Sequence, residues 1–314
     1  MSRRGKVLLH MPLHLADETR LPQFDRTIAA GLRSRGAEVV VQHRQAEALQ
    51  NLKAGADFHL VHNGHAQGHC VLNCAIAYLA PYFYADPRGI YFESSLTAAQ
   101  FDASAQPADA ATRRFQTLHA RYVHPRISRY SQPEAAQNFP TGAIAIFLQD
   151  WSEPVERARY MTAERMMQTV IAGAQGRPVI VKPHPRTRGP ETVSLLHDLS
   201  THHPEVIITE ANLHDILAST AVCVTISSSV ALESMLHRKP VVLFGRSDLH
   251  HCAMTVRQPA DWRQALQHAL NHDWPYEAFV YWFTQAHLRG GKDMMEPLLA
   301  RMRTAGADFT ALGL

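Results

Sequence analysis

Cysteine is scarce in this chain, with four among 314 residues. Four thiols are too few for a disulfide framework, and Cys223 lies within an apolar run, so we expect reduced thiols and a cytoplasmic protein. The chain also lacks the run of roughly 20 apolar residues that a membrane-spanning helix requires. The apolar run Val7–Leu9 behind the basic start is far too short for a signal peptide. We therefore expect a soluble protein, and peripheral contact with the inner face of a membrane stays open.

Positively and negatively charged residues are nearly equal in number. The 31 Lys and Arg residues exceed the 28 Asp and Glu residues by a formal net charge of +3. Proteins that bind nucleic acid usually carry a concentrated basic stripe, so this balance argues against a nucleic acid partner. A Walker loop and a Gly-x-Gly-x-x-Gly turn after a strand are both absent, which leaves ATP and NAD without support. What remains is an ordinary globular composition, 46% hydrophobic and 19% charged.

Strand-like and helix-like stretches alternate in the first part of the chain. An apolar strand, an amphipathic helix stopped by Gly36 and a second strand follow one another within about forty residues, which is typical of a parallel sheet with crossover helices. A third strand, a helix of small residues and a fourth strand continue the pattern. These expected elements are the strands Lys6–Leu9, Glu38–Gln42, Phe58–His62 and Gly89–Phe92 and the helices Phe24–Arg35 and Cys70–Ala80.

A second series of the same kind starts at Ala143. Residues 102–118, rich in Ala, Ser, Pro and Asp, are interpreted as a surface excursion before it. The series contains the expected strands Ala143–Leu148, Val179–Val181, Val206–Ile208, Val222–Ile226 and Val241–Phe244 and the helices Ala163–Ala174, Val193–His202, Leu213–Ser219 and Val230–His237.

Two such series predict an α/β protein with two Rossmann-like domains, whose parallel sheets face a cleft. We expect an N-terminal, acceptor-side domain over residues 1–140 and a nucleotide-sugar-binding domain over residues 141–285. Residues 286–314 are predicted to form terminal helices that pack back on the first domain.

The strongest local signal is the run Lys182-Pro183-His184-Pro185-Arg186 at the end of an expected strand. The two prolines fix backbone φ angles and stiffen the loop, so the His184 side chain is held in one direction. Lys182, His184 and Arg186 present cationic or hydrogen-bonding groups suited to a phosphate. Ligands of α/β sheets bind at the carboxyl ends of strands, which favours a binding loop over a rigid turn with solvated charges.

Three serines, Ser227, Ser228 and Ser229, follow another expected strand and precede a helix. Hydroxyl and backbone N–H groups at a helix N-terminus suit an anion. Plain N-capping needs one serine, so three permit both roles. Glu233 lies about one turn into the helix, where its carboxylate is placed to accept hydrogen bonds from a ribose.

These motifs resemble those of the capsule polysaccharide Kdo transferases, which are GT-B-type enzymes that use CMP-activated Kdo. The likeness is strongest over residues 143–250, and the pairing of His-Pro with Ser-Ser is also similar to that of the CMP-binding bacterial sialyltransferases. The segments that carry it are Lys-Pro-His-Pro, the Thr-x-Ser-Ser strand end, Glu233, Lys239-Pro240-Val241, Phe244-Gly245-Arg246, the Gln-containing strand end Phe147-Leu148-Gln149-Asp150 and the acidic, aromatic segment Gly89–Leu96.

The resemblance also bears on a catalytic carboxylate. The capsule enzymes are retaining transferases, and by analogy with retaining glycosidases such a reaction can employ a carboxylate nucleophile. Asp150 and Glu93 are the candidates in this chain. The chain departs from the family in its thin acidic complement, with Glu153 as the other acidic residue after Gln149. An Asp after a strand also commonly caps the next turn.

Several histidines follow expected strands. His10 and His14 come after the first strand, and His62, His65 and His69 come after the third, all at the edge where an acceptor is expected to bind. Neutral histidine can act as a general base near pH 7. We take His10 and His65 as candidates for that role.

A zinc site is the alternative for some of these residues. His65, His69, Cys70 and Cys74 fit helical i, i+4 spacing, but they form two rows displaced around the expected helix. Four tetrahedral ligands from a single helix are awkward, so we expect no metal, and we expect the two cysteines to lie in the core.

The resemblance implies a GT-B-like glycosyltransferase of bacterial surface polysaccharide synthesis. It would move Kdo or a related ulosonic acid from its CMP-activated form to a glycan or glycolipid acceptor, with retention and with no cofactor besides the nucleotide-sugar donor. Lys182, His184, Arg186 and Ser227–Ser229 would hold the donor phosphate, and Glu233 the ribose. An NDP-sugar transferase or epimerase on the same scaffold and a non-catalytic polysaccharide-assembly subunit stay open.

Overall fold

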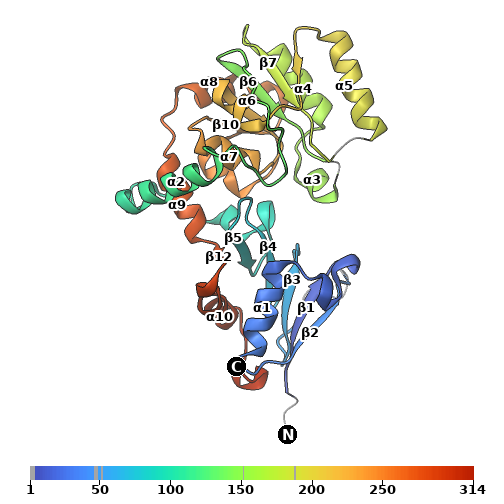
Figure 1. The fold of residues 1–314 in the computed structure, drawn as a ribbon, viewed down its shortest axis with the longest axis vertical. Coiled ribbons are helices and arrows are strands. Elements are labelled where there is room, and N and C mark those ends of the chain that lie inside the picture. The colour runs from blue at the N-terminus through green and yellow to red at the C-terminus, as the bar shows by residue number, and fades with distance from the viewer. Residues whose placement is uncertain (1–3, 46–48, 51, 151, 187–188) are drawn as a thin grey trace. The chain divides into compact units, whose positions relative to one another are not determined.

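A computed structural model describes residues 4–45, 49–50, 52–150, 152–186 and 189–314 of the chain (Figure 1). The chain forms two compact units. The first unit consists of Met1–Gln100 and Thr284–Leu314, and the second unit consists of Phe101–Phe283. No helix of the described residues has the length and the apolar character needed to cross a membrane.

The first unit is built around a six-stranded sheet in the order β12-β5-β4-β3-β1-β2. Strands β1 to β4 are parallel, and β5 and β12 are antiparallel additions at one edge. The strands are β1 (Val7–Met11), β2 (Val39–His43), β3 (Phe58–His62), β4 (Val71–Ile76), β5 (Tyr82–Asp86) and β12 (Leu288–Arg289), and the α-helices are α1 (Gln23–Arg33), α10 (Met295–Thr304) and α11 (Phe309–Leu312).

Helices α1 and α10 lie side by side although they come from opposite ends of the chain, as the blue and red ribbons of Figure 1 show. The buried face of α1 carries Phe24, Ile28 and Leu32, one helical turn apart. The helices approach closely at Gly31, where an added Cβ would lie 2.5 Å from the Met295 sulfur. The C-terminal segment therefore completes the core of the first unit.

The second unit has a six-stranded, wholly parallel sheet in the order β11-β10-β9-β6-β7-β8. Its central strand β6 is buried along its full length, as expected for a strand covered by helices on both faces. The strands are β6 (Ala143–Phe147), β7 (Val179–Lys182), β8 (Ile207–Ile208), β9 (Thr220–Thr225), β10 (Val241–Leu243) and β11 (Met254–Thr255). The helices are α2 (Ala108–Tyr122), α3 (Glu153–Ala158), α4 (Ala163–Ala172), α5 (Pro190–His202), α6 (Leu213–Ser219), α7 (Val230–Leu236), α8 (Trp262–Asn271) and α9 (Tyr276–Gln285), the last of which ends in the first unit.

The Phe244-Gly245-Arg246 motif has a packing role in this unit. The Tyr160 N–H donates to the Phe244 carbonyl at 2.9 Å, and the Arg246 N–H donates to the Ala158 carbonyl at 2.8 Å. An added Cβ at Gly245 would lie 3.0 Å from the Ala158 oxygen, closer than a side chain can come. Glycine thus lets the segment after α3 run directly against β10.

The predicted fold class is confirmed, with two Rossmann-like α/β units built on parallel strands. Two elements are wrong. The expected helix Cys70–Ala80 is strand β4, because a continuous apolar run buried on both faces has the same pattern as a buried helix. The expected strand Gly89–Phe92 contains a 3₁₀ turn at Tyr91–Glu93 instead.

The first unit also ends earlier than the range 1–140 that the sequence suggested. Residues 101–140 pack with the second unit, where α2 contacts α7 and the Arg238 guanidinium lies 4.7 Å from the Phe115 ring centroid. The surface excursion expected at 102–118 therefore contains most of a helix anchored to the second sheet.

Candidate functional site

The residues predicted to bind a nucleotide sugar come together at one edge of the second unit. Strands β9, β6 and β7 are parallel neighbours, so their carboxyl ends meet at the same edge. Asp150 follows β6, the loop Lys182–Arg186 follows β7, and Ser227–Ser229 follow β9. We call this group, together with Gln149 and Glu233, the strand-end site.

Gln149 joins two of the strand ends. Its Oε1 accepts a 2.6 Å hydrogen bond from the Ser227 N–H, and its Nε2 donates to the Ser227 hydroxyl at 3.4 Å. The Ser228 hydroxyl accepts from the Val230 N–H at 3.3 Å. The Ser229 hydroxyl makes no hydrogen bond within the part of the chain that the structure describes. The serine loop is thus fixed by Gln149 and keeps hydroxyl groups available for a ligand.

Lys182 turns its ammonium group into the protein. Its Nζ donates to the carbonyl oxygens of Glu210 and Ala211 at 2.9 and 2.7 Å. Burial lowers the pKa of Lys182, and the nearby Glu210 carboxylate opposes that effect. An ammonium has three donors, and two of them fix the segment before α6. Lys182 therefore has a structural role at this strand end.

His184, Arg186 and Asp150 form a charged group around Tyr130. The Arg186 Nη2 donates to the Tyr130 hydroxyl at 2.7 Å and to Asp150 Oδ2 at 3.4 Å. The His184 imidazole meets the Tyr130 ring edge-on, with 5.2 Å between the centroids. Asp150 Oδ1 also accepts a hydrogen bond from the Ser152 hydroxyl at 2.7 Å. The candidate carboxylate is therefore held by neighbours on two sides.

The site has a positive electrostatic character. Partial burial lowers the pKa of His184, the Asp150 carboxylate raises it, and the cations of Arg186, Arg129 and Lys182 lower it further. His184 is therefore neutral near pH 7 and offers a phosphate a hydrogen bond rather than a charge. The three cations supply the charge that attracts an anionic ligand.

Tyr130 belongs to residues 126–137, a segment that is fixed to the first turn of α6. Arg126 forms a two-pronged ion pair with Asp215, with N–O distances of 2.9 and 2.7 Å. The Asn212 side-chain amide donates to the Arg126 carbonyl at 3.1 Å. Two-pronged Arg–carboxylate pairs give directional binding, so the segment is held in register.

A pair of buried histidines secures the same segment. The His214 Nε2 lies 2.8 Å from the Ile127 carbonyl, so this nitrogen carries the proton, and the His214 Nδ1 accepts from His237 Nε2 at 2.9 Å. Burial lowers the pKa of both rings, that of His237 to about 3, and each neutral ring is further favoured by nearby cationic or imidazole groups. The contact with Ile127 thus depends on two neutral rings.

Glu233 is fully buried on α7, and neither of its carboxyl oxygens makes a hydrogen bond with a residue that the structure describes. Burial raises the pKa of Glu233 to about 7. The Ser128 hydroxyl and the Arg129 guanidinium act in the opposite direction, although Ser128 is not in hydrogen-bonding geometry. A buried carboxyl group without a hydrogen-bond partner lowers the stability of the fold.

The predicted candidates His10, His65 and Glu93 belong to the first unit. His10 is buried, with Nε2 lying 2.9 Å from His59 Nδ1 and with Nδ1 lying 3.3 Å from the Gln42 amide. Burial and the neighbouring His59 lower the pKa of His10 to about 4. Because both ring nitrogens are occupied, His10 joins strands β1, β2 and β3 and has no free nitrogen for a substrate.

His65 is exposed in the loop after β3. The Asn73 side-chain oxygen fixes this loop by accepting a hydrogen bond from the Ala66 N–H at 2.8 Å. Glu93 is half-buried at the end of a 3₁₀ turn and packs against Gly89, where an added Cβ would lie 2.8 Å from the Glu93 Cβ.

The zinc alternative assumed that His65, His69, Cys70 and Cys74 lie on one helix. Cys74 instead lies in strand β4, and both Cys70 and Cys74 are buried. Within the described residues, no three His, Cys, Asp or Glu side chains are grouped closely enough to hold a metal ion.

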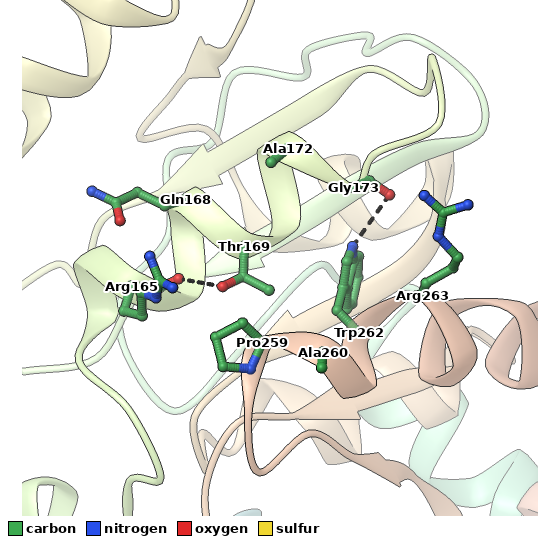
Figure 2. Close-up of a pocket in the computed structure, with 9 residues that line it drawn as sticks. All are labelled: Arg165, Gln168, Thr169, Ala172, Gly173, Pro259, Ala260, Trp262 and Arg263. Atoms are coloured by element: carbon green, nitrogen blue, oxygen red, sulfur yellow. Dashed lines mark hydrogen bonds between the residues drawn. The ribbon is translucent and has the colours of Figure 1, made fainter.

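A groove of about 490 Å³ lies apart from the strand-end site (Figure 2). Trp262 is one of its lining residues and donates to the Gly173 carbonyl at 3.2 Å, and it lies between Arg165 and Arg263 in the view of Figure 2. Its lining residues are Arg165, Gln168, Thr169, Ala172, Gly173, Pro259, Ala260, Trp262 and Arg263. None of them belongs to the strand-end site, so we do not assign the groove to the donor.

The sequence patterns missed Arg129 and Tyr130. These residues lie outside every expected strand and helix, and their partners Glu233, His184 and Arg186 are distant in the sequence. The available signal in the sequence was an arginine next to a tyrosine shortly before the second series of strands and helices. This signal is weak, because such a pair is common.

Comparisons with known proteins agree with this geometry. Residues 157–290 match the family described as capsule polysaccharide biosynthesis protein. The KpsC beta Kdo 2,7 transferase of Thermosulfurimonas dismutans has a similar structure, with a TM-score of 0.54, 13% identity, and coverage of 95% of this chain and 99% of that chain. The KpsC beta Kdo 2,4 transferase of the same organism gives a TM-score of 0.53 at 16% identity, covering 88% of this chain and 89% of that one.

A Methanocaldococcus jannaschii UDP-GlcNAc 2-epimerase is less similar, with a TM-score of 0.39, 10% identity, and coverage of 96% of this chain and 99% of that chain. No curated protein matches the sequence. The matched residues contain the Lys-Pro-His-Pro loop, the serine loop and Glu233. The match to the capsule polysaccharide biosynthesis family thus covers residues 157–290, where the predicted motifs lie, and the chain has a fold similar to the GT-B-like fold of the KpsC transferases.

Proposed function

We propose that the protein is a glycosyltransferase that moves Kdo or a related ulosonic acid from its CMP-activated form to a glycan or glycolipid acceptor. The observation that carries the proposal is the meeting of Asp150, His184, Arg186 and Ser227–Ser229 at the carboxyl ends of β6, β7 and β9. The family match and the fold of the KpsC transferases support the same class of reaction.

The donor phosphate would lie between the loop Lys182–Arg186 and the serine loop. Neutral His184 and the serine hydroxyls would donate hydrogen bonds to it, and Arg186 would balance its charge. The same groups would stabilise the charge that develops on the departing nucleotide, where fixed dipoles contribute most to catalysis. No cofactor besides the donor is needed if these groups neutralise the phosphate.

Asp150 is the proposed carboxylate nucleophile for a retaining reaction. Its ion pair with Arg186 holds it beside the loop Lys182–Arg186. Glu233 is proposed as the ribose partner, and because it is enclosed in this structure, the Ser128 side of its surroundings must give way for the ribose to reach it.

The acceptor belongs to the first unit in this proposal, as in the sequence-based expectation. Since a surface polysaccharide is assembled from cytoplasmic nucleotide sugars, we place the reaction in the cytoplasm, with peripheral contact at the inner face of the membrane.

Titration calorimetry with CMP, UDP and GDP tests the donor assignment. We expect CMP to bind at least about tenfold more tightly than the other two, a difference of about 1.4 kcal/mol. His184→Ala should weaken CMP binding by a similar factor. His197→Ala, which changes an exposed histidine on α5 of the same unit, should leave it unchanged.

Other outcomes would replace the proposal. Tight binding of UDP or GDP without CMP would favour an NDP-sugar transferase or epimerase. An absence of binding to all three would favour a non-catalytic assembly subunit.

A further inference from the structure

We infer that the groove beside Trp262 is a binding site for an acidic glycan, in which Arg165 and Arg263 hold carboxylates of the sugar chain. The groove belongs to the second unit alone and shares no lining residue with the strand-end site. The inference rests on the proposed function for the source of its ligand, because a polysaccharide that contains Kdo or a related ulosonic acid carries a carboxylate on each such sugar.

Two helices of the second unit supply the lining of the groove (Figure 2). The lining residues of α4 run from Arg165 to Ala172 at i, i+3, i+4 and i+7 spacing, which places them along one face of the helix. The other lining residues come from the first turn of α8, including Arg263, and from the turn before it. The volume of about 490 Å³ lies within the range of roughly 300–1,000 Å³ that is usual for ligand sites.

Arg165 and Arg263 give the groove its charge. Both side chains are exposed, and neither guanidinium makes a hydrogen bond or an ion pair with a residue that the structure describes. None of the nine described lining residues is acidic. A planar guanidinium presents parallel N–H donors that match the two oxygens of a carboxylate. The charge and the donor geometry of the groove are therefore complementary to carboxylate groups.

The acidic residues next to the lining segments have partners of their own. The Glu164 carboxylate accepts a hydrogen bond from the Gln168 amide at 3.1 Å. The Asp261 carboxylate accepts from the backbone N–H groups of Arg257 and Gln258 at 3.2 and 3.1 Å. The two carboxylates are thus held on α4 and on the turn before α8, and the two groove arginines stay available for a ligand.

The carbonyl groups at the C-terminal end of α4 also have donors. The Gly173 carbonyl accepts from Trp262 Nε1 at 3.2 Å. The Thr169 carbonyl accepts from the Gly173 N–H, and the Ile171 carbonyl accepts from the Ala174 N–H, both at 3.2 Å. A helix C-terminus repels anions through its unsatisfied carbonyl groups, so these bonds weaken that repulsion at the groove.

The two sides of the groove are fixed to each other. Trp262 is 2% exposed and packs against Gly173, where an added Cβ would lie 2.5 Å from Trp262 Cδ1. Together with the hydrogen bond from Nε1, this contact joins the start of α8 to the end of α4. The groove is therefore formed before a ligand arrives, which lowers the entropy cost of binding.

The lining favours a sugar chain over a nucleotide or a nucleic acid. Trp262 is the one aromatic residue among the described lining residues, and its ring is buried, so a base has no aromatic face to stack on. Gln168, Ala172 and Pro259 are exposed and offer an amide for sugar hydroxyls and small apolar surfaces for the C–H faces of sugar rings. A site of this kind would tether the growing polysaccharide to the protein between transfers.

Titration calorimetry with a Kdo trisaccharide tests the site, with the same trisaccharide reduced from carboxylates to alcohols as its neutral counterpart. We expect the wild type to bind the acidic form at least about tenfold more tightly. The double variant Arg165→Gln/Arg263→Gln should lose about tenfold or more in affinity for the acidic form. Arg113→Gln, which changes an exposed arginine of α2 outside the groove, should bind it as the wild type does.

Ala172 provides a second test that leaves both arginines in place. It is an exposed lining residue at the end of α4. Ala172→Glu adds a negative charge to the groove, and Ala172→Gln adds a neutral side chain of nearly the same size. The glutamate variant should bind the acidic trisaccharide about fivefold more weakly than the glutamine variant, because the two differ in charge alone. Thermal unfolding of each variant checks that the fold is retained.

The outcomes separate this site from the donor site. Wild-type affinity in the double arginine variant, or equal binding of the acidic and the reduced trisaccharide, overturns the inference. Equal binding of a single-stranded DNA, lost in the same variants, would indicate a general anion-binding surface and overturns it too. A wild type that binds CMP but not the trisaccharide overturns the inference and leaves the proposed function intact. One that binds the trisaccharide but none of CMP, UDP and GDP overturns the proposed function and leaves the glycan site intact.

Discussion

The Tyr130 hydroxyl accepts a 2.7 Å hydrogen bond from the Arg186 guanidinium, across 56 residues of sequence. The bond ties residues 126–137 to the loop that follows β7. Because Arg186 also reaches Asp150, one tyrosine outside the sheet helps to set the position of the loop Lys182–Arg186 and of Asp150. The precision of the strand-end site thus depends on a segment that precedes the whole second sheet in the chain.

Tyr130→Ala should weaken CMP binding by about tenfold, because Arg186 loses both its hydrogen bond and the ring beneath it. Tyr130→Phe keeps the ring and should lose less. Tyr160→Ala is a matched control, since Tyr160 also lies under an arginine, Arg257, in the same unit. Calorimetry with CMP measures all three, and equal affinities for wild type and Tyr130→Ala would remove Tyr130 from the site.

Two variants of Gln149 test two effects separately. Gln149→Ala removes the support of the serine loop, and Gln149→Glu adds a charge beside it. The alanine variant leaves the Ser227 N–H without its acceptor and should lower the free energy of unfolding by about 1–2 kcal/mol. The glutamate variant keeps that acceptor but adds a negative charge beside the phosphate, so it should lose CMP affinity by about tenfold with a smaller loss of stability. Chemical denaturation and calorimetry on both variants check this, and a glutamate variant that binds CMP normally contradicts it.

Glu233 should make the second unit less stable as the pH rises. Its folded-state pKa of about 7 exceeds its ordinary value of 4.5, so the folded state holds a proton that the unfolded state has released. The stabilisation from that proton is complete below about pH 4.5 and is lost as the pH rises through about 7. Glu233→Gln should therefore melt close to the wild type at pH 5 and clearly above it at pH 8.

Tryptophan fluorescence is suited to this measurement, because all four tryptophans belong to the second unit. Glu164→Gln, an exposed change on α4, should keep the wild-type pH dependence. If the difference in melting temperature between wild type and Glu233→Gln were the same at pH 5 and at pH 8, the raised pKa of Glu233 would be refuted.

The buried His214–His237 pair predicts the opposite response to acid. Both folded-state pKa values lie below the ordinary value of 6.5, that of His237 at about 3. The stability that the neutral rings give is present above pH 6.5 and is lost as the pH falls from there toward 3, because the unfolded state takes up protons first. His237→Gln keeps a donor for His214 and removes one titrating ring, so the melting temperature should fall less steeply between pH 6.5 and 4.5. If the variant lost stability as steeply as the wild type over that range, the pair would have no part in the acid response.

The sequence predicted which residues meet at the strand ends of the second unit. The loop Lys182–Arg186 and the serines after β9 carry local signals, namely prolines, cations and hydroxyls at strand ends, and the parallel sheet guarantees that such ends meet. The direction of the Lys182 ammonium could not be read in the same way, since its acceptors are backbone carbonyls whose position depends on tertiary packing.

The misses have a similar origin. Strand β4 and a buried helix share one pattern of apolar residues, and only the neighbouring strands β3 and β5 decide between them. Tyr130 depends on contacts with residues that are far from it in the chain, about which a single sequence carries no direct signal. His10 was selected for its place after a strand, and the partners that occupy its ring became visible only in the assembled sheet.

The first unit is interrupted in the chain by the whole second unit, and this has a consequence for synthesis on the ribosome. Residues up to Gln100 emerge first, yet Met295, Leu298 and Met302 of α10 complete their core last. The second unit can fold while the apolar face of α1 still waits for its cover. In the nascent chain, the apolar surface of α1 therefore stays exposed for the longest time. We expect chaperones to bind the chain in this region.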